Sequence, residues 1–427
     1  TTIDYLIPEI EICVETNGCG SVDVEIIDGE KILAKGSALT QGKTEVQIQP
    51  IGAKLWDCDN PNLLICRVSF EGDVHEYSFG IRKIEVDSEK GLRINGKPTI
   101  LYGACIHHDN GFLGAAAHPF AEYRKIKLIK ENGYNAIRSA HNPCSKALLE
   151  ACDKYGLYVL DEYVDMWYIH KTRFDYANHM LDWWQHDLKD MVVKDYNHPS
   201  VIMYSIGNEV SETAQKRGIE LCGEMVGYLK RLDARPVTCG VNLFFNYLSS
   251  LGFGVYTDKK AEASAKKKKH KAVGSEFFNN LAGILGDKVM KFGATLGGSD
   301  RKTRDAFEKL DVAGYNYGIL RYKKDLRKYP NRVILGTETF CKDAYLFYEL
   351  AKNNKALIGD FVWAGMDYLG EVGVGAWVYK DHCKDFDYGV GWHTAGSGRM
   401  DITGSPIAEA AYTSVVFGYD PRRMAVV

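Results

Sequence analysis

Hydrophobic and polar residues alternate with a period of two along the first part of the chain, up to about residue 86. Turns rich in Gly, Asn and Asp separate these short runs. Such alternation is typical of antiparallel strands with one buried face, so we predict a β-sandwich over residues 1–86. No cluster of charged residues there suggests chemistry, and we expect a structural role. The clearest runs are Glu9–Val14, Val22–Ile27, Thr44–Ile48 and Leu64–Val68.

From about residue 98 the pattern changes to short apolar segments that alternate with longer amphipathic ones. Repeated β-then-α units over roughly 320 residues predict a closed parallel (β/α)₈ TIM barrel, which we place at residues 87–427. A doubly wound open sheet is the alternative, but Gly370–Gly375 has no helix after it and is not its phosphate motif. The eight predicted strands are Ile100–Cys105, Ala136–Ser139, Tyr158–Asp161, Val201–Ile206, Pro236–Gly240, Val312–Tyr315, Val333–Gly336 and Ile358–Trp363.

A long Lys-rich insertion, at about residues 244–308, separates the fifth and sixth predicted strands. It carries the basic run Lys266–Lys271, which is typical of a solvated, mobile loop and less often of a nucleic-acid site. Loops that follow strands lie on the catalytic face of a barrel, so we hypothesise that the insertion acts as a lid.

Composition narrows the class of protein. The 427 residues are 45% hydrophobic and 26% charged, as in a globular protein with a core. The net charge of −3 provides no attraction to nucleic acid or anionic membranes, and no apolar run reaches the ~18 residues of a membrane span. The eleven scattered cysteines form no C-x-x-C pair, so we expect neither a zinc ribbon nor a disulfide framework, and we expect a cytoplasmic location. Homo-oligomerisation stays open.

Two carboxylates stand at the ends of predicted barrel strands, where the active site of a TIM barrel lies. Glu209 follows the fourth strand and Glu338 follows the seventh. A single strand-end Glu is readily explained by a salt bridge, but a pair suits cleavage of an acetal. One carboxylic acid protonates the leaving oxygen, and one carboxylate meets the developing positive carbon. Thr337 and Thr339 can donate hydrogen bonds that keep Glu338 ionised, whereas Asn208 can help orient Glu209 as the acid.

The run Asn197–Glu209 closely resembles the acid/base signature of glycoside hydrolase family 2, which contains β-galactosidases, β-glucuronidases and β-mannosidases. The resemblance covers nearly the whole chain and implies that residues 1–86 are an immunoglobulin-like domain that begins partway through. The further matching motifs, in family order, are Leu55–Asp57, Asn60–Leu63, Phe79–Arg82, His107–Asp109, Arg138–Pro143, Asp161–Trp167, Asn316–Tyr317 and Trp363–Tyr368.

The resemblance implies an exo-acting β-glycosidase that retains configuration by double displacement. Glu338 then forms the covalent glycosyl-enzyme, and Glu209 protonates the aglycone oxygen and later activates water, with carboxyl groups about 5–5.5 Å apart. Tyr317 is expected to hydrogen-bond the nucleophile and Trp363 to form a floor under the sugar. The expected contacts to the sugar or to the nucleophile's surroundings are His107, Asp109, Arg138, His141 and Asn208.

Each of these roles has a structural alternative. Arg138 and Glu162 could form an ion pair inside the barrel mouth, Trp363 could be barrel packing, and His141 could be a satisfied buried histidine. The chain also departs from the family at Tyr204, where Trp is usual, and at Cys144, where a second Pro is common. Both replacements are compact, and we expect activity to survive them.

Three further points bear on function. The family's N-terminal jelly-roll domain is expected to be absent from this chain, which puts substrate affinity in doubt and keeps a sugar-binding fragment without activity as an alternative. A metal-dependent hydrolase with His107, His108 and His141 as ligands is a rival, but adjacent residues on a strand point to opposite faces. Met166 and Trp167 occupy the region where some β-galactosidases bind Mg²⁺, so we expect no metal and no cofactor.

The identity of the sugar rests on the weakest signals. A β-glucuronidase neutralises the substrate carboxylate, usually with an Asn-x-Lys motif in a late barrel loop. Asn353–Lys355 falls in the predicted seventh helix and Asn95–Lys97 lies before the first strand, while Lys380 and Arg399 offer another route. The tail Gly396–Gly404 resembles members known as β-galactosidases. We therefore favour a β-galactoside as the substrate, with a β-glucuronide as the alternative.

Overall fold

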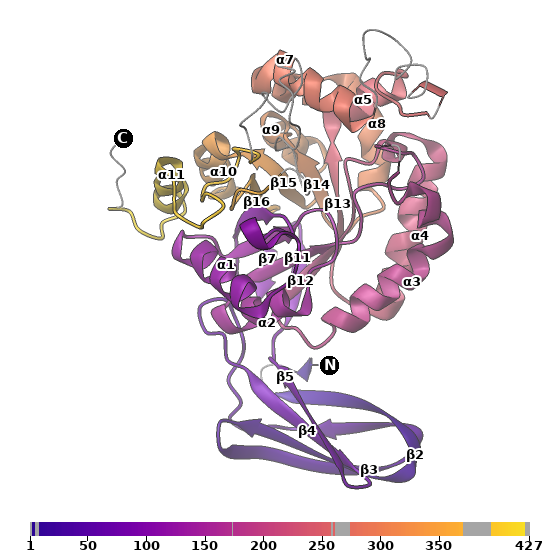
Figure 1. Cartoon of the computed structure of the whole chain (residues 1–427), viewed down its shortest axis with the longest axis vertical. Helices are drawn as coiled ribbons and strands as arrows, with labels where there is room; N and C mark the ends of the chain where they lie inside the picture. The colour runs from indigo at the N-terminus through magenta and orange to yellow at the C-terminus, as the bar shows by residue number, and fades with distance from the viewer. Residues whose placement is uncertain are drawn as a thin grey trace.

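The computed structural model describes residues 2–4, 8–172, 174–257, 259–260, 274–369 and 394–422. Its centre is a closed barrel of eight parallel strands, which confirms the predicted TIM barrel (Figure 1). The seventh strand continues beyond its predicted end to Phe340, so Glu338 lies within it and not after it. The strands are β9 (Leu101–Ile106), β10 (Ala136–Ser139), β11 (Tyr158–Glu162), β12 (Val201–Asn208), β13 (Val237–Asn242), β14 (Ala313–Asn316), β15 (Ile334–Phe340) and β16 (Leu357–Trp363).

Helices cover the outside of the barrel and side chains fill its inside, so each barrel strand is buried on both faces. The strands are therefore continuous apolar runs in the sequence. All eight residues of β12 are buried. The helix α2 follows β10, and the side chain of Ser145 caps its start by accepting a hydrogen bond from Leu148 N. Gly156 ends the helix with a left-handed backbone, at φ 72°. A Cβ there would stand 2.3 Å from the carbonyl oxygen of Cys58, so only glycine fits. The outer helices are α1 (Pro119–Glu131), α2 (Lys146–Tyr155), α3 (Ala177–Asp195), α4 (Lys216–Leu232), α9 (Ile319–Lys328), α10 (Ala344–Ala351) and α11 (Ala408–Val416).

The insertion after β13 is largely helical in its described part. It consists of α5 (Leu243–Ser250), α7 (Ser275–Ala294) and α8 (Gly297–Phe307). The basic run Lys266–Lys271 and the glycine-rich Gly370–Gly375 lie outside the described residues. Short 3₁₀ helices follow three strands at the same end: η1 (Gly111–Leu113), η2 (Ser211–Ala214) and η3 (Cys341–Asp343).

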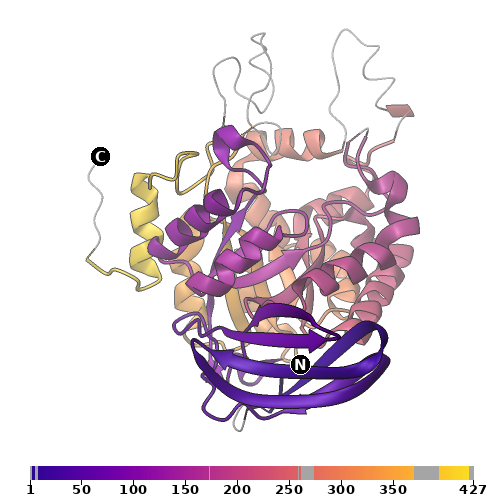
Figure 2. The ribbon, with the colours of Figure 1, turned by 60° about the horizontal axis from the view of Figure 1, so that its bottom comes forward.

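The N-terminal part is one antiparallel sheet of five strands. The long strand β2 pairs with β3 along most of one edge. On the other edge, the start of β2 pairs with β1 and the last part of β2 pairs with β4. Figure 2 shows the long strands bowed beneath the barrel. Because all five strands belong to a single sheet, the immunoglobulin-like sandwich stays a prediction. The strands are β1 (Thr2–Asp4), β2 (Glu9–Asp28), β3 (Lys31–Ile48), β4 (Leu64–Phe70) and β5 (Asp73–Phe79).

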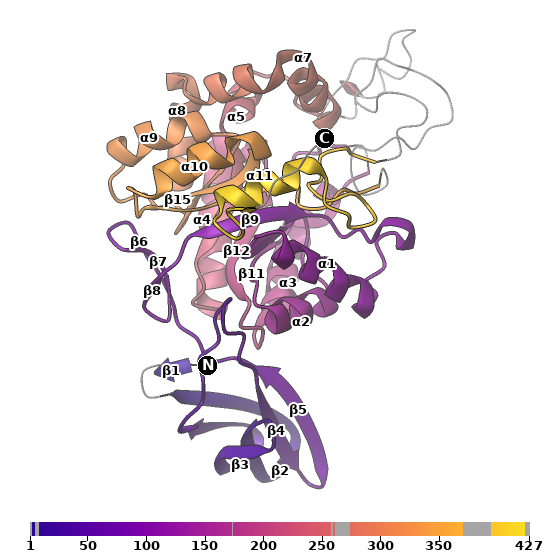
Figure 3. The same cartoon turned by 90° about the vertical axis from the view of Figure 1, so that its left-hand side faces the viewer.

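A small sheet and several hydrogen bonds join this part to the barrel. The strands β6 (Ile84–Asp87), β7 (Gly91–Ile94) and β8 (Lys97–Pro98) form it, so the predicted boundary at residue 86 falls inside β6. Trp56 is fully buried, and its indole nitrogen donates to Asp153 O at 2.9 Å. Arg82 donates to Pro199 O and Val201 O, each at 3.0 Å. The N-terminal sheet and the helices α5, α7 and α8 therefore lie at opposite ends of the barrel (Figure 3).

None of the helices in the described ranges is long and apolar enough to cross a membrane. The ten cysteines within these ranges are free thiols. Of the two departures from the family pattern, Tyr204 is buried and its hydroxyl accepts from Arg235 at 3.1 Å, while Cys144 N donates to Asp161 at 2.8 Å.

Candidate active site

Glu209 and Glu338 are presented at the carboxyl ends of two barrel strands. Glu209 follows β12 with a left-handed backbone, at φ 44°, and its amide donates to Gly240 O at 2.7 Å. Tyr317 follows β14 in the same region, at φ 54°, with its amide 2.7 Å from Glu338 O. Non-glycine residues adopt this conformation at a cost, and they concentrate at functional sites. The left-handed backbone therefore marks two positions at the carboxyl ends of barrel strands, Glu209 and Tyr317.

The carboxylate of Glu338 is buried and faces a cation. Arg138, fully buried on β10, donates Nη1 to Glu338 Oε1 at 2.9 Å and to Thr337 O at 3.0 Å. Burial raises the pKa of Glu338, the charges of Arg138 and His141 oppose that rise, and the charge of Glu209 adds to it. The charge of Glu209 is thus felt at Glu338.

Glu162, which was predicted only as a structural partner of Arg138, organises the floor of the site. Arg138 donates Nε and Nη2 to Glu162 Oε2 at 2.9 and 2.6 Å. Ser205 Oγ donates to the same oxygen at 2.7 Å, and His141 Nδ1 lies 2.7 Å from Oε1. The guanidinium of Arg138 therefore makes both contacts: the ion pair with Glu162 and the hydrogen bond to Glu338.

Glu209 is held by neutral donors among the described residues. Asn242, at the end of β13, donates Nδ2 to Glu209 Oε1 at 2.9 Å, and Asn316, at the end of β14, donates to the same oxygen at 3.1 Å. Asn316 is fixed in turn, because its Oδ1 accepts from Thr337 Oγ1 at 2.6 Å. The two carboxylates thus occupy different electrostatic surroundings.

Asn208 connects these two surroundings. Its Oδ1 accepts from Arg138 Nη2 and from Asn316 Nδ2, both at 2.9 Å. Its Nδ2 donates to Asp165 Oδ1 at 2.9 Å and lies 3.3 Å from His141 Nε2. With both ends engaged, the Asn208 side chain is locked in orientation.

The rings of His107, His141 and Trp363 form a wall beside Glu338, whose Oε1 lies 3.6 Å from His141 Nε2. The rings of His141 and Trp363 stack with centroids 5.4 Å apart and an interplanar angle of 7°. His107 meets Trp363 edge-on at 5.2 Å and Tyr368 at 4.3 Å. Burial, helped by His141, lowers the pKa of His107 to about 3, so this ring is neutral at working pH. Burial alone would lower the pKa of His141, but the hydrogen bond to Glu162 and the charge of Asp165 raise it.

Two predicted site residues have different settings. Asp109 uses its carboxylate on the protein backbone, because Oδ1 accepts from Gly111 N at 2.6 Å and Oδ2 accepts from Leu369 N at 2.7 Å. Its expected sugar contact stays a prediction. Burial, together with the charges of Glu338 and Glu209, raises the pKa of the half-buried Tyr317. The role expected for Tyr317, a side-chain hydrogen bond to Glu338, stays a prediction.

Sequence reasoning did not assign site roles to five residues that join the network. Asp165 and Lys171 form an ion pair at 2.7 Å, and Lys171 Nζ also donates to Asn208 O at 2.9 Å. The position of Asn242 at a strand end could have indicated it, whereas no sequence signal marked Lys171. The residues are Glu162, Asp165, Lys171, Asn242 and Asn316.

The rival ligand set does not converge in the structure. His107 packs among rings, His108 Nε2 lies 3.2 Å from Ser139 Oγ, and His141 Nδ1 faces Glu162. These three imidazoles point to different partners, so they do not form the metal site of the rival hydrolase.

Two of the candidate segments for binding a uronic acid lie at the other end of the barrel. Asn95 stands between β7 and β8, and residues 353–355 lie between α10 and β16, so both segments are on the side where barrel strands begin. Arg399 donates Nη2 to Ser397 O at 3.0 Å, and Lys380 lies outside the described residues. Residues 353–355 follow α10, which corrects their placement within the seventh helix.

Comparison with known proteins gives consistent matches. Residues 84–283 match the family described as glycosyl hydrolases family 2, TIM barrel domain. A β-galactosidase of Bacteroides ovatus is 38% identical over 251 residues, which cover 50% of this chain and 29% of that protein. A β-glucuronidase of Bacteroides fragilis is 26% identical over 272 residues, which cover 56% of this chain and 38% of that protein.

A solved structure extends the match to nearly the whole chain. The crystal structure of a glycosyl hydrolase family 2 member from Bacteroides cellulosilyticus superposes with a TM-score of 0.76 and 32% identity. The match covers 98% of this chain and 49% of that one. The chain therefore spans about half the length of that solved relative and less of the curated relatives.

Proposed function

Because this chain belongs to glycosyl hydrolase family 2, we propose that it is a retaining β-glycosidase, with Glu338 as the nucleophile and Glu209 as the acid/base. The observation that carries the assignment is the difference in surroundings. Arg138 contacts Glu338 at 2.9 Å, whereas Glu209 accepts from the neutral amides of Asn242 and Asn316. A carboxylate that accepts a hydrogen bond from a cation is favoured in its ionised form, as a nucleophile requires.

The reaction then proceeds in two steps. Glu338 attacks the anomeric carbon while Glu209 gives its proton to the glycosidic oxygen, so the aglycone leaves as an alcohol and a glycosyl ester forms. Glu209, now ionised, takes a proton from water, and the hydroxide oxygen displaces Glu338. Two inversions at one carbon leave the β configuration unchanged. The wall of His107, His141 and Trp363 offers an apolar ring face on which one side of a sugar can stack.

We favour a β-galactoside as the substrate, with a β-glucuronide as the second candidate. Two observations support this order. The relative from Bacteroides ovatus, a β-galactosidase, shares more identity with this chain than the β-glucuronidase from Bacteroides fragilis. In addition, Lys171, a cation near the two carboxylates, already donates hydrogen bonds to Asp165 and to Asn208 O. An engaged lysine is a poor partner for a substrate carboxylate.

The test compares 4-nitrophenyl β-D-galactoside with the β-D-glucuronide, on the wild type and on E338Q, E209Q and E349Q. Glu349 is a surface residue of α10 paired with Lys352, so E349Q is the matched control. Turnover of the galactoside that is lost in E338Q and retained in E349Q supports the proposal. Proton NMR of the first product distinguishes the stereochemistry, because a retaining enzyme releases the β-anomer. Early release of the α-anomer, or full activity in E338Q, overturns the mechanism.

A further inference from the structure

A pocket opens directly beside Glu209. It encloses about 570 Å³, open solvent at its mouth included, and Glu209 is one of its lining residues. Its walls come from the segment after β11, the segment after β12 and the helices α5 and α7 of the insertion. Neither His141 nor Trp363 lines it. This cavity is therefore separate from the surface on which the sugar is expected to stack.

The position of this pocket defines what it can hold. A general acid lies within hydrogen-bond reach of the oxygen that it protonates, about 2.6–3.2 Å. If Glu209 protonates the glycosidic oxygen, the group attached to that oxygen extends to the side of Glu209 that faces away from the sugar. This argument rests on the proposed function of Glu209.

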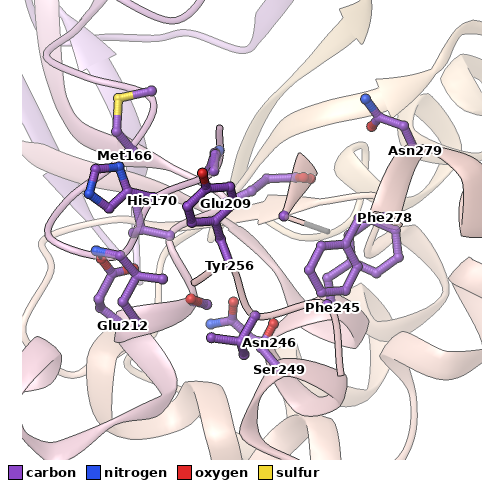
Figure 4. A pocket seen from close by; sticks show the side chains of 17 residues that line it. Met166, His170, Glu209, Glu212, Phe245, Asn246, Ser249, Tyr256, Phe278 and Asn279 are labelled. Atoms are coloured by element: carbon purple, nitrogen blue, oxygen red, sulfur yellow. Dashed lines mark hydrogen bonds between the residues drawn. The ribbon is translucent and has the colours of Figure 1, made fainter. Parts of the chain in front are cut away.

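The walls of the pocket are rich in apolar rings. Phe245 of α5 and Phe278 of α7 lie with centroids 4.6 Å apart, and Tyr256 lies 5.6 Å from His170. Figure 4 shows the two Phe rings on one side of the pocket and Met166 with His170 on the other, with Tyr256 between them. Such faces favour a planar ring in stacked or edge-on contact.

The ionisable groups that line the pocket, Glu209 apart, are engaged within the protein. Lys171 donates to Asp165 and to Asn208 O, and His170 Nδ1 lies 2.7 Å from Asp175 Oδ1. Glu212 is buried and accepts from Ile169 N at 2.6 Å. A charged ligand would therefore be desolvated without gaining a free partner among the described lining residues, which is unfavourable.

The backbone of the insertion at Gly254 packs closely against the rings of Phe277 and Phe278. Gly254 has φ +66°, and a Cβ there would stand 2.5 Å from Phe277 and 2.6 Å from Phe278. The chain thus approaches these rings more closely than any other residue type allows. Asn246, Ser249 and Asn279 add polar atoms to the lining.

We propose that this pocket is the aglycone site, and that it selects a neutral aromatic aglycone over a charged or purely aliphatic one. The insertion at about residues 244–308 then acts as a specificity element, because it supplies Phe245, Tyr256 and Phe278. The natural substrates are accordingly aryl β-glycosides, whose leaving group is a phenol.

The test compares two galactosides with the same sugar, 4-nitrophenyl and methyl, on the wild type, F278A, F278Y and F292A. Phe292 is 63% exposed on the same helix α7, so F292A is the matched control. Each substrate is compared with itself across the variants, so the reactivity of the leaving group cancels. We expect kcat/KM for the aryl substrate to fall about tenfold in F278A and to recover in F278Y, which retains a ring. The methyl substrate should change less than about twofold.

Equal losses for both substrates in F278A, or an F292A loss that matches F278A, would overturn the proposal. Wild-type turnover of the methyl galactoside shows that the proposed activity holds even where the aglycone proposal fails. If neither galactoside is turned over, calorimetric titration with 2-naphthol tests the pocket by itself. Binding that is lost in F278A and kept in F292A supports an aromatic site, and binding that is unaffected by F278A contradicts it.

Discussion

Arg138 and Glu338 form a buried ion pair at the mouth of the barrel, with Nη1 2.9 Å from Oε1. The same guanidinium donates to Glu162 and to Asn208 Oδ1. Asn316 then links Asn208 to Glu209. One arginine therefore sets the charge of one carboxylate and, through two amides, helps fix the position of the other.

The ion pair makes a prediction about pH. Arg138 holds down the pKa of Glu338 against burial, which raises it. In R138K the planar fork is lost and the charge is displaced, so the pKa of Glu338 should rise further. Because the nucleophile must be ionised, the acid limb of kcat/KM should move to higher pH, with a fall in rate of about 100-fold at the optimum. Measured pH–rate profiles check this.

The control for that experiment is R93K, because Arg93 pairs with Asp87 in the small sheet beneath the barrel. Its profile should match the wild type. An acid limb that stays in place in R138K would mean that Arg138 does not govern the ionisation of Glu338.

Asn242 gives a second prediction, since it donates to Glu209 at 2.9 Å and contacts no other carboxylate of the network among the bonds described. N242A removes one donor to Glu209, a bond worth about 1.5–3 kcal/mol once Glu209 becomes ionised in the first step of the proposed reaction. We expect kcat/KM for an aryl galactoside to fall about 10- to 100-fold. Exposed Asn353 supplies the control variant N353A, which should keep full activity. Unchanged activity in N242A would remove Asn242 from the machinery.

The sequence predicted the barrel well because its strands are buried on both faces. Eight apolar segments at regular spacing carry that signal without tertiary information. Only the end of β15 differed notably, because Thr337, Glu338 and Thr339 are polar residues inside a strand. Their polarity reflects the site they line and not a turn.

The network between the two carboxylates was harder to predict. Asn208 and Arg138 stood in recognisable motifs, but their shared contact depends on side-chain directions that no spacing specifies. Lys171 was missed for the same reason, because it lies in an irregular segment whose side-chain directions the sequence does not specify. Its ion pair with Asp165 is visible only in the structure. The helices of the insertion were missed because its lysine-rich part dominated the composition.

Trp56 gives a prediction about stability. Its side chain is fully buried between the N-terminal part and the barrel, and its ring meets Tyr158 edge-on at 5.8 Å. W56A loses this packing and the bond to Asp153 O, so the free energy of unfolding should fall by about 3–5 kcal/mol. Urea unfolding followed by circular dichroism measures the change. The surface residue Trp183, 53% exposed, provides W183A, for which a change within about 0.5 kcal/mol is expected. Equal losses in both variants would contradict the argument.

The last prediction concerns Asp360, a fully buried carboxyl of β16 that the proposed mechanism does not use. Burial raises its pKa to about 7, although hydrogen bonds from Thr339 and Tyr322 oppose the rise. The folded state therefore keeps this proton to higher pH than the unfolded state, whose carboxyl has an ordinary pKa near 3.8. The contribution of Asp360 to the free energy of unfolding is therefore greatest below about pH 4 and is lost as the pH rises to about 7.

D360N cannot ionise, so it should escape that loss while keeping an oxygen for the hydroxyl of Thr339 or Tyr322. At about 1.4 kcal/mol per pH unit, the stability of D360N relative to the wild type should increase by on the order of 4 kcal/mol between pH 4 and pH 8. Urea unfolding at the two pH values measures the difference. Asp182 is exposed on α3, and D182N should show no comparable gain. A D360N protein whose relative stability does not change with pH would mean that Asp360 is already ionised in the fold at neutral pH, with its charge stabilised by Thr339 and Tyr322.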